Sequence, residues 1–272
     1  MFPPPGIVLK KALPCLCLAA LALTSPAQLP KQEIPQETQG LLQRQMSWDD
    51  NQPGKNNPNR LYFQFSEIEE TISSGKRVAH YRVYVFGAPE NKKYTLTVWK
   101  IGAEPRNLSN EVYVNAKGLL LMHKPRPGQE DSDFLGDEEF HLNVQAARAE
   151  PVRYALTSSD KEILIYGTLV PFPRENTDRG CRLEVRLAVP DATAVLIYAE
   201  GLPANAEIPF QMLSAGQPET GKFSVNVEGR AVSPAFPALS GMESNSLRVT
   251  LTTTGCSATV ELPWGKGSYH QL

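Results

Sequence analysis

Apolar and polar residues alternate with a period of two along most of the chain from residue 61 onward. The segment RLYFQFS (60–66) places leucine and phenylalanine at every second position. The segments RVAHYRVYVFG (77–87) and KKYTLTVWKIG (92–102) repeat the pattern, and APENKK supplies a turn with proline and asparagine between them. This alternation is typical of half-buried antiparallel strands joined by hairpins. We therefore expect a β-rich protein.

The predicted strands fall into two groups, separated at VPFPRENTDRG (170–180), where two prolines and a charged run break the alternation. The first group continues with strands at 111–115, 118–122, 139–147, 152–157 and 162–169. The second group comprises CRLEVRLAVP, AVLIYAEG, GKFSVNVEG and the hairpin LRVTLTTTGCSATVELP, with Gly255 at its turn. Short strands punctuated by Gly, Pro and Asn predict β-sandwiches. We predict an all-β fold with two consecutive antiparallel β-sandwich domains, residues 59–173 and 174–266, and a tail at 267–272.

Residues 1–27 have the layout of a secretory signal peptide. Lys10 and Lys11 precede an apolar run over 12–24, and small residues follow at the end of the segment. The run is shorter than the roughly 20 residues that cross a bilayer. We therefore expect cleavage after Ala27, export to the periplasm or the extracellular space, and no membrane insertion afterwards. An uncleaved anchor and a lipid anchor are the alternatives.

Residues 28–58 are rich in glutamine, asparagine, proline and charge. Such a segment buries too little apolar surface to order itself, so we expect a disordered arm. Leu41, Leu42, Met46 and Trp48 are its apolar exceptions. These residues predict one short helical turn that docks on the body of the protein.

Removal of the leader leaves two of the four cysteines, Cys181 and Cys256. Each is in phase with the apolar positions of its predicted strand, so both should point into one core. An even pair in an exported protein suggests a disulfide, with two buried free thiols as the alternative. In this spacing and strand context, residues 181–262 resemble an immunoglobulin-like β-sandwich. The resemblance implies architecture only, and Thr254 stands where that family carries a tyrosine.

Charge and motifs argue against several classes of function. The leader holds two of the 27 basic residues and none of the 29 acidic ones, so the mature chain carries a formal charge of −4. A mildly acidic chain without a basic stripe is a poor candidate for binding nucleic acid. The sequence has no Gly-x-Ser-x-Gly, His-Glu-x-x-His or dinucleotide-binding motif. We predict no cofactor and no catalytic residues, and leave open a hydrolase whose site forms only in three dimensions.

The loop KPRPGQEDSDFLGDEE (124–139) is a weak metal candidate. Calcium prefers several oxygen ligands on a flexible loop, which the loop could supply through Asp131, Asp133, Asp137 and Glu138. Leu135 stands where an EF-hand would place its third acidic ligand. We therefore favour a solvated acidic loop and predict no bound metal.

The polar phase of the first three strands holds the most interesting group of candidate residues. If these strands are neighbours, one sheet face carries Tyr62, Gln64, His80, Arg82, Tyr84, Thr95, Thr97 and Trp99. Aromatic rings among hydrogen-bonding side chains suit a carbohydrate, with Tyr62, His80, Arg82, Tyr84 and Trp99 as candidate ligand-binding residues. The alternative is that the acidic loop, the arm or the second domain covers this face.

The sequence favours a non-catalytic exported structural or protein-interaction module of the cell envelope or extracellular space. Its partner would be a protein bound at an unpaired edge strand. Fully covered sheet edges without an exposed apolar patch would argue against this. The alternative is a carbohydrate-binding module that uses Tyr84 and Trp99 on a polysaccharide. This alternative requires that the Trp99 indole be exposed to solvent.

Overall fold

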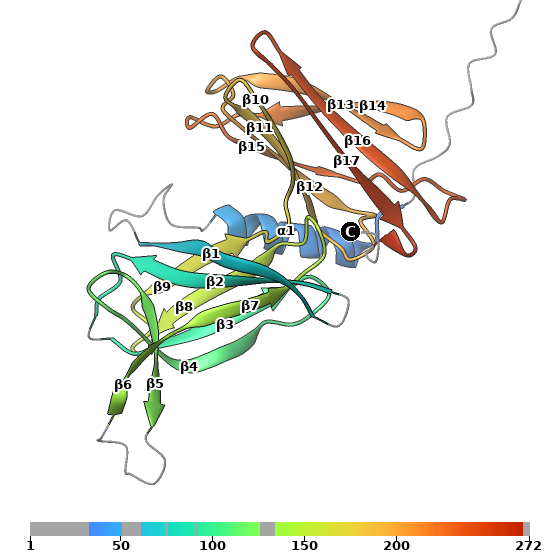
Figure 1. Ribbon diagram of the computed structural model, residues 1–272. Helices are drawn as coiled ribbons and strands as arrows, with labels where there is room; N and C mark the ends of the chain where they lie inside the picture. Colours follow the sequence, from blue (N-terminus) through green and yellow to red (C-terminus); the bar gives the residue numbers. More distant parts are fainter. Residues whose placement is uncertain (1–32, 51–60, 74–75, 91, 126–133, 269–272) are drawn as a thin grey trace, which may run out of the picture.

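The chain forms two antiparallel β-sandwiches with one helix between them, as the computed structural model shows (Figure 1). The structure describes residues 33–50, 61–73, 76–90, 92–125 and 134–268, and the side chains of all of these except 50, 123–125 and 134–137. The predicted signal peptide, the remainder of the arm, Asp131, Asp133 and the last four residues lie outside the described residues. The prediction of an all-β fold with antiparallel sheets is confirmed.

The first sandwich packs a three-stranded sheet on a six-stranded sheet. The smaller sheet has the order β1 (Tyr62–Ser73), β2 (Lys76–Phe86) and β7 (His141–Gln145). The larger sheet has the order β6 (Phe134–Glu139), β5 (Leu120–Pro125), β4 (Arg106–Val114), β3 (Tyr94–Lys100), β8 (Val152–Ser158) and β9 (Leu164–Leu169). Burial alternates along β2 and β3, so every second side chain enters a shared core that includes Val83, Val85, Leu96 and Leu156.

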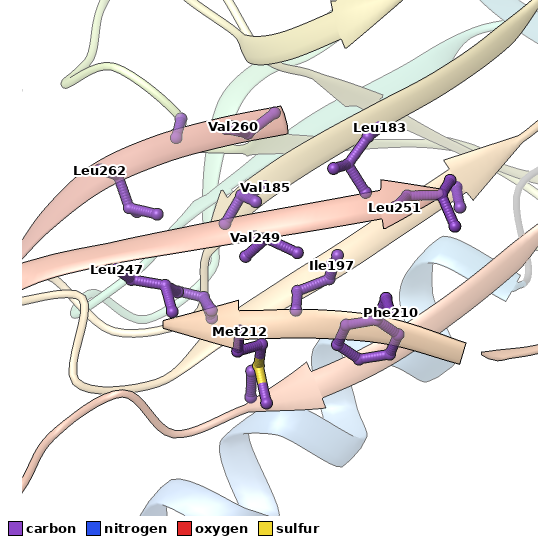
Figure 2. Close-up of a cluster of buried hydrophobic side chains, with 14 of the residues drawn as sticks. Leu183, Val185, Ile197, Phe210, Met212, Leu247, Val249, Leu251, Val260 and Leu262 are labelled. Carbon is purple, nitrogen blue, oxygen red and sulfur yellow. The ribbon is translucent and has the colours of Figure 1, made fainter. Parts of the chain in front are cut away.

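The second sandwich packs two four-stranded sheets. One has the order β10 (Arg174–Asp178), β11 (Cys181–Leu187), β12 (Val195–Glu200) and β15 (Ala231–Ala235). The other has the order β14 (Gln217–Ser224), β13 (Glu207–Ser214), β16 (Ser244–Thr253) and β17 (Cys256–Gly265). Figure 2 shows the aliphatic and aromatic side chains of both sheets directed toward one another to form the core.

The predicted disulfide joins Cys181 at the start of β11 to Cys256 at the start of β17, with the Cα atoms 6.1 Å apart. It therefore links the two sheets. The strand order differs from that of an immunoglobulin domain, where the second strand lies between the first and the fifth; here β11 lies between β10 and β12. Membership of residues 181–262 in that class stays a prediction.

Three local predictions are corrected. The segments 77–87 and 92–102 do not form a hairpin: β2 pairs with β1 and β7, and β3 pairs with β4 and β8. The turn between them carries the chain from one sheet to the other, where the Tyr94 hydroxyl donates to the Pro89 carbonyl at 3.0 Å. The segments 124–139 and 170–180, which we predicted to interrupt the strands, contain the strands β6 and β10. Both lie at sheet edges, where charged residues are tolerated.

Part of the predicted disordered arm forms helix α1 (Gln36–Asp50), which is longer than the single turn we expected. Pro35 precedes its first residue, and Glu37 lies in the first turn, where the helix dipole favours an anion. The helix lies between the two sandwiches (Figure 1). No helix within the described part of the chain has the length and apolarity needed to span a bilayer.

Candidate functional site

The outer face of the β1-β2-β7 sheet brings together five of the predicted face residues. In the β1–β2 register, Tyr62 is opposite Phe86, Gln64 opposite Tyr84, and Ser66 opposite Arg82. His80 follows on the same phase of β2, whereas the intervening residues of β2 enter the core. We name this surface the β1-β2-β7 face, comprising Tyr62, Gln64, His80, Arg82, Tyr84 and Phe86 with His141 and Asn143 of β7.

Three aromatic rings form a row on this face. The Tyr62 and Phe86 rings stack with centroids 5.0 Å apart and planes at 28°, and the Phe86 and Tyr84 rings with centroids 6.0 Å apart and planes at 10°. Tyr62 is 38% exposed. We did not predict Phe86, although its position on the polar phase of β2 was a usable signal, because an apolar residue on that phase points to solvent.

Hydrogen-bonding side chains continue the face beyond the rings. Arg82 Nε donates to Glu139 Oε2 at 2.9 Å, and His141 Nε2 lies 3.2 Å from the same oxygen. The hydrogen bond with His141, supported by Arg82, holds the pKa of Glu139 below its usual range. His80 contacts Asn143 through Nδ1 at 2.7 Å. The face thus offers donors and acceptors held in fixed positions beside a flat apolar surface.

The remaining predicted residues, Thr95, Thr97 and Trp99, lie elsewhere. They belong to β3 in the other sheet, so they face away from Tyr84 across the sandwich. Trp99 is only 6% exposed, and its Nε1 donates to the Ala103 carbonyl at 3.0 Å. The condition set for the carbohydrate alternative, an exposed Trp99 indole, is therefore not met, and a carbohydrate site built on Tyr84 and Trp99 together is excluded.

Helix α1 covers Trp99 and binds the first sandwich through its last turn. The Trp48 ring lies 5.4 Å from the Trp99 ring and 4.6 Å from the Tyr166 ring of β9. Asp49 accepts hydrogen bonds from Arg153 Nε at 3.2 Å and Nη2 at 3.1 Å. The Arg153 guanidinium is also 5.4 Å from the Trp99 ring centroid.

The same helix binds the second sandwich. Leu42 is buried among Ala188, Ala194 and Leu196, with Met46 beside them. The buried Gln45 side chain donates to the Ala188 carbonyl at 2.7 Å. Because α1 contacts both sandwiches, it holds them together.

Asp49 connects the two sandwiches directly. Besides Arg153, it contacts Thr168 of the first sandwich and Tyr198 and Arg186 of the second. Burial alone would raise the pKa of Asp49, but Arg153 and Arg186 hold it below its ordinary value. Burial and the nearby Asp49 carboxylate raise the pKa of Tyr198, so its hydroxyl stays protonated and donates to Asp49. This cluster is a structural connection, since every group is committed to a partner.

Strand β1 is the second exposed feature of the first sandwich. It has twelve residues, lies at the edge of its sheet and, among the described strands, pairs with β2 alone. Three of the six exposed large hydrophobic side chains in the described residues belong to it: Tyr62, Ile68 at 49% and Ile72 at 77%. No described residue forms a backbone hydrogen bond with its other edge. The structure therefore has an edge strand of the kind that the predicted binding of a protein partner requires.

The structure describes only part of the loop that carries the candidate metal ligands. Asp131 and Asp133 lie outside the described residues, and the Asp137 side chain is not described. Within the described part of the chain, no group of three or more His, Cys, Asp and Glu residues could hold a metal ion. His80 contacts Thr71 and Asn143 of its own sheet, and His141 contacts Glu139 at the end of β6 in the larger sheet.

No known protein-family model matches this chain, and no curated protein is significantly similar to it. Function must therefore be argued from the surfaces described above.

Proposed function

We propose that this protein is a non-catalytic exported binding protein that accepts an extended segment of a partner protein along β1. The observation that carries the proposal is a twelve-residue edge strand that has exposed apolar residues and one side to which no described strand pairs. An added strand forms main-chain hydrogen bonds with such an edge and gains specificity from alternate side chains. The disulfide supports export, because disulfides persist in oxidising compartments.

The charge of β1 specifies the chemistry of the partner. Glu67, Glu69 and Glu70 follow one another around a β-bulge at Ile68. Arg77 of β2 pairs with Glu70 at 2.6 Å, and no described residue pairs with Glu69. Opposite charges on adjacent strands stabilise pairing and like charges oppose it. The partner segment therefore carries lysine or arginine alternating with apolar residues.

The bulge and the acidic residues of β1 also protect its open edge from pairing with a second copy of the protein. Proteins protect edge strands from self-pairing with bulges and charged side chains. Two copies of β1 would bring their glutamates together, whereas a basic segment would not meet this repulsion. The same features thus oppose pairing with a second copy and favour a partner of opposite charge.

A photo-cross-linking residue at Ile72, in the cells that make the protein, tests this proposal. We expect one discrete protein adduct, which disappears when Glu69→Lys is added. The control places the same cross-linker at Val227, which is similarly exposed, at 73%, but lies in the second sandwich. The proposal fails if Ile72 gives no adduct, if both positions capture the same proteins, or if Glu69→Lys has no effect.

A second candidate function is carbohydrate binding on the β1-β2-β7 face, favoured by the row of Tyr62, Phe86 and Tyr84 rings. Their flat faces suit the apolar side of sugar rings, and Arg82, Glu139 and Asn143 can fix hydroxyl groups. A glycan array with wild type, Tyr84→Ala and Tyr113→Ala tests it, since Tyr113 is a partly exposed tyrosine of the other sheet. Binding must be lost in Tyr84→Ala and kept in Tyr113→Ala.

A further inference from the structure

A cavity of about 450 Å³ lies between α1 and the larger sheet of the first sandwich, away from the β1-β2-β7 face. Its lining includes Gln43, Arg44 and Trp48 of α1, Trp99 of β3 and Tyr166 of β9. Its volume falls within the range typical of small-molecule sites. Helix α1 therefore does more than cover Trp99, because it also forms one wall of a cavity.

Aromatic rings form the apolar part of this cavity. Trp48 contacts Tyr166 edge-on, at 67° between the ring planes, and is tilted by 54° against Trp99. Trp99 is buried beneath, whereas Trp48 and Tyr166 remain half-buried. A ring-shaped ligand can thus lie against Trp48 and Tyr166 while Trp99 supports them from below.

Three polar side chains of the cavity, those of Gln43, Arg44 and Trp48, are donors without a partner among the described residues. Arg44 is exposed and forms no ion pair with the described residues, and the Gln43 amide has no hydrogen-bond partner among them. The Trp48 indole Nε1 is buried and likewise lacks an acceptor in the described part of the chain. Buried donors are normally satisfied, so such an atom calls for an explanation. No carboxylate belongs to the described lining.

We propose that this cavity binds a uronic acid unit of an acidic glycan. The sugar ring lies against Trp48 and Tyr166, its carboxylate pairs with Arg44, and Gln43 donates to a hydroxyl or ring oxygen. A cation and unpaired donors without a neighbouring carboxylate favour an anion rich in acceptor oxygens. This site is independent of β1 and of the β1-β2-β7 face.

Tryptophan fluorescence gives a direct measurement, because two of the three tryptophans line the cavity and Trp264 is buried in the second core. The full chain is titrated with trigalacturonate and, separately, with a glucuronate trisaccharide, and calorimetry confirms binding. We expect at least one to change the emission, with affinity falling about tenfold between low and moderate salt as the Arg44 contact is screened. The matched methyl-esterified trisaccharide should bind at least tenfold more weakly.

Variants locate the site. Arg44→Gln should weaken binding about tenfold without changing thermal unfolding, because Arg44 is exposed. Arg179 is an exposed arginine of the second sandwich, so the Arg179→Gln variant should bind the trisaccharide as tightly as wild type does. The proposal is overturned if neither trisaccharide binds, if the ester binds equally well, if Arg44→Gln retains full affinity, or if an aromatic carboxylate such as indole-3-acetate binds while both uronates fail.

Discussion

The two outer faces of the first sandwich carry similar residues but meet different surroundings. The β1-β2-β7 face presents Tyr62, Tyr84 and Phe86 to solvent, whereas on the opposite face Trp99 is buried beneath Trp48. Both sets of residues lie on the polar phase of their strands. The difference arises from α1, which comes from a distant part of the sequence. Alternation therefore predicts which side chains leave the core but not whether they reach solvent.

The largest effect is expected from breaking the contact that holds α1 on the covered face. Asp49→Ala leaves the buried Arg153 guanidinium without its bidentate partner. Loss of one member of a buried ion pair costs about 3–5 kcal/mol. We expect a loss of this size in chemical unfolding, together with rapid amide exchange along α1.

Glu261→Ala is the matched control for Asp49→Ala. Glu261 of β17 pairs with Arg248 of β16, and both side chains are about half exposed to solvent. Exposed ion pairs contribute about 1 kcal/mol or less. Equal losses for the two variants would contradict the assignment of Asp49 as the residue that fastens α1.

Acidification should weaken the contact between Asp49 and the two arginines, with a smaller loss of stability than Asp49→Ala causes. Arg153 and Arg186 hold the pKa of Asp49 below its ordinary value despite burial. As the pH falls, the Asp49 carboxyl therefore takes up a proton in the unfolded chain before it does so in the folded protein. The stabilisation is complete above about pH 4 and is lost as the pH falls through the folded-state pKa. We expect tryptophan emission to shift to longer wavelength below about pH 4, and Asp49→Asn to lose this transition. A transition unchanged in Asp49→Asn would assign it to other groups.

Removing the covering ring itself should cost less than removing Asp49. Trp48 is half-buried, so Trp48→Ala should destabilise the protein by about 1–3 kcal/mol, below the value for a fully buried tryptophan. Trp99 then becomes exposed, and iodide should quench its emission. Met46→Ala, which removes a contact of α1 with the second sandwich, is the control that keeps Trp99 covered. Trp99 that remains protected in Trp48→Ala would contradict the covering role.

Helix α1 was difficult to predict because half of its docking face is polar. Leu42, Gln45, Met46 and Asp49 follow the helical spacing i, i+3, i+4 and i+7, and all four contact the sandwiches. A search for apolar periodicity finds only two of them. The partners of Gln45 and Asp49 lie more than 100 residues away, so nothing in the local sequence marks these polar residues as buried.

The core of the second sandwich was easier to predict, because the alternation along each single strand already indicates which residues are buried. Cys181, Leu183, Val185 and Leu187 alternate along one strand, and each is buried. The phase of each cysteine places it in this core, and the even cysteine pair in a chain expected to be exported then favoured the disulfide. Strand pairing is different, since alternation fixes which face a residue occupies but not which strand lies beside it. This is why β3, with Trp99, was placed beside β2.

The smallest effect on stability is expected on the uncovered face. Tyr84 stacks on Phe86 at the surface, and an aromatic pair contributes about 1 kcal/mol. Tyr84→Ala should therefore lower the free energy of unfolding by about 1 kcal/mol or less and leave the exchange of α1 amides unchanged. A loss near that of Asp49→Ala would mean that the face is part of the structural framework. The Tyr84→Ala variant could lose little free energy of unfolding and yet fail to bind a glycan that the wild type binds. This result would identify Tyr84 as a binding residue, because its ring is then needed for the ligand and not for the fold.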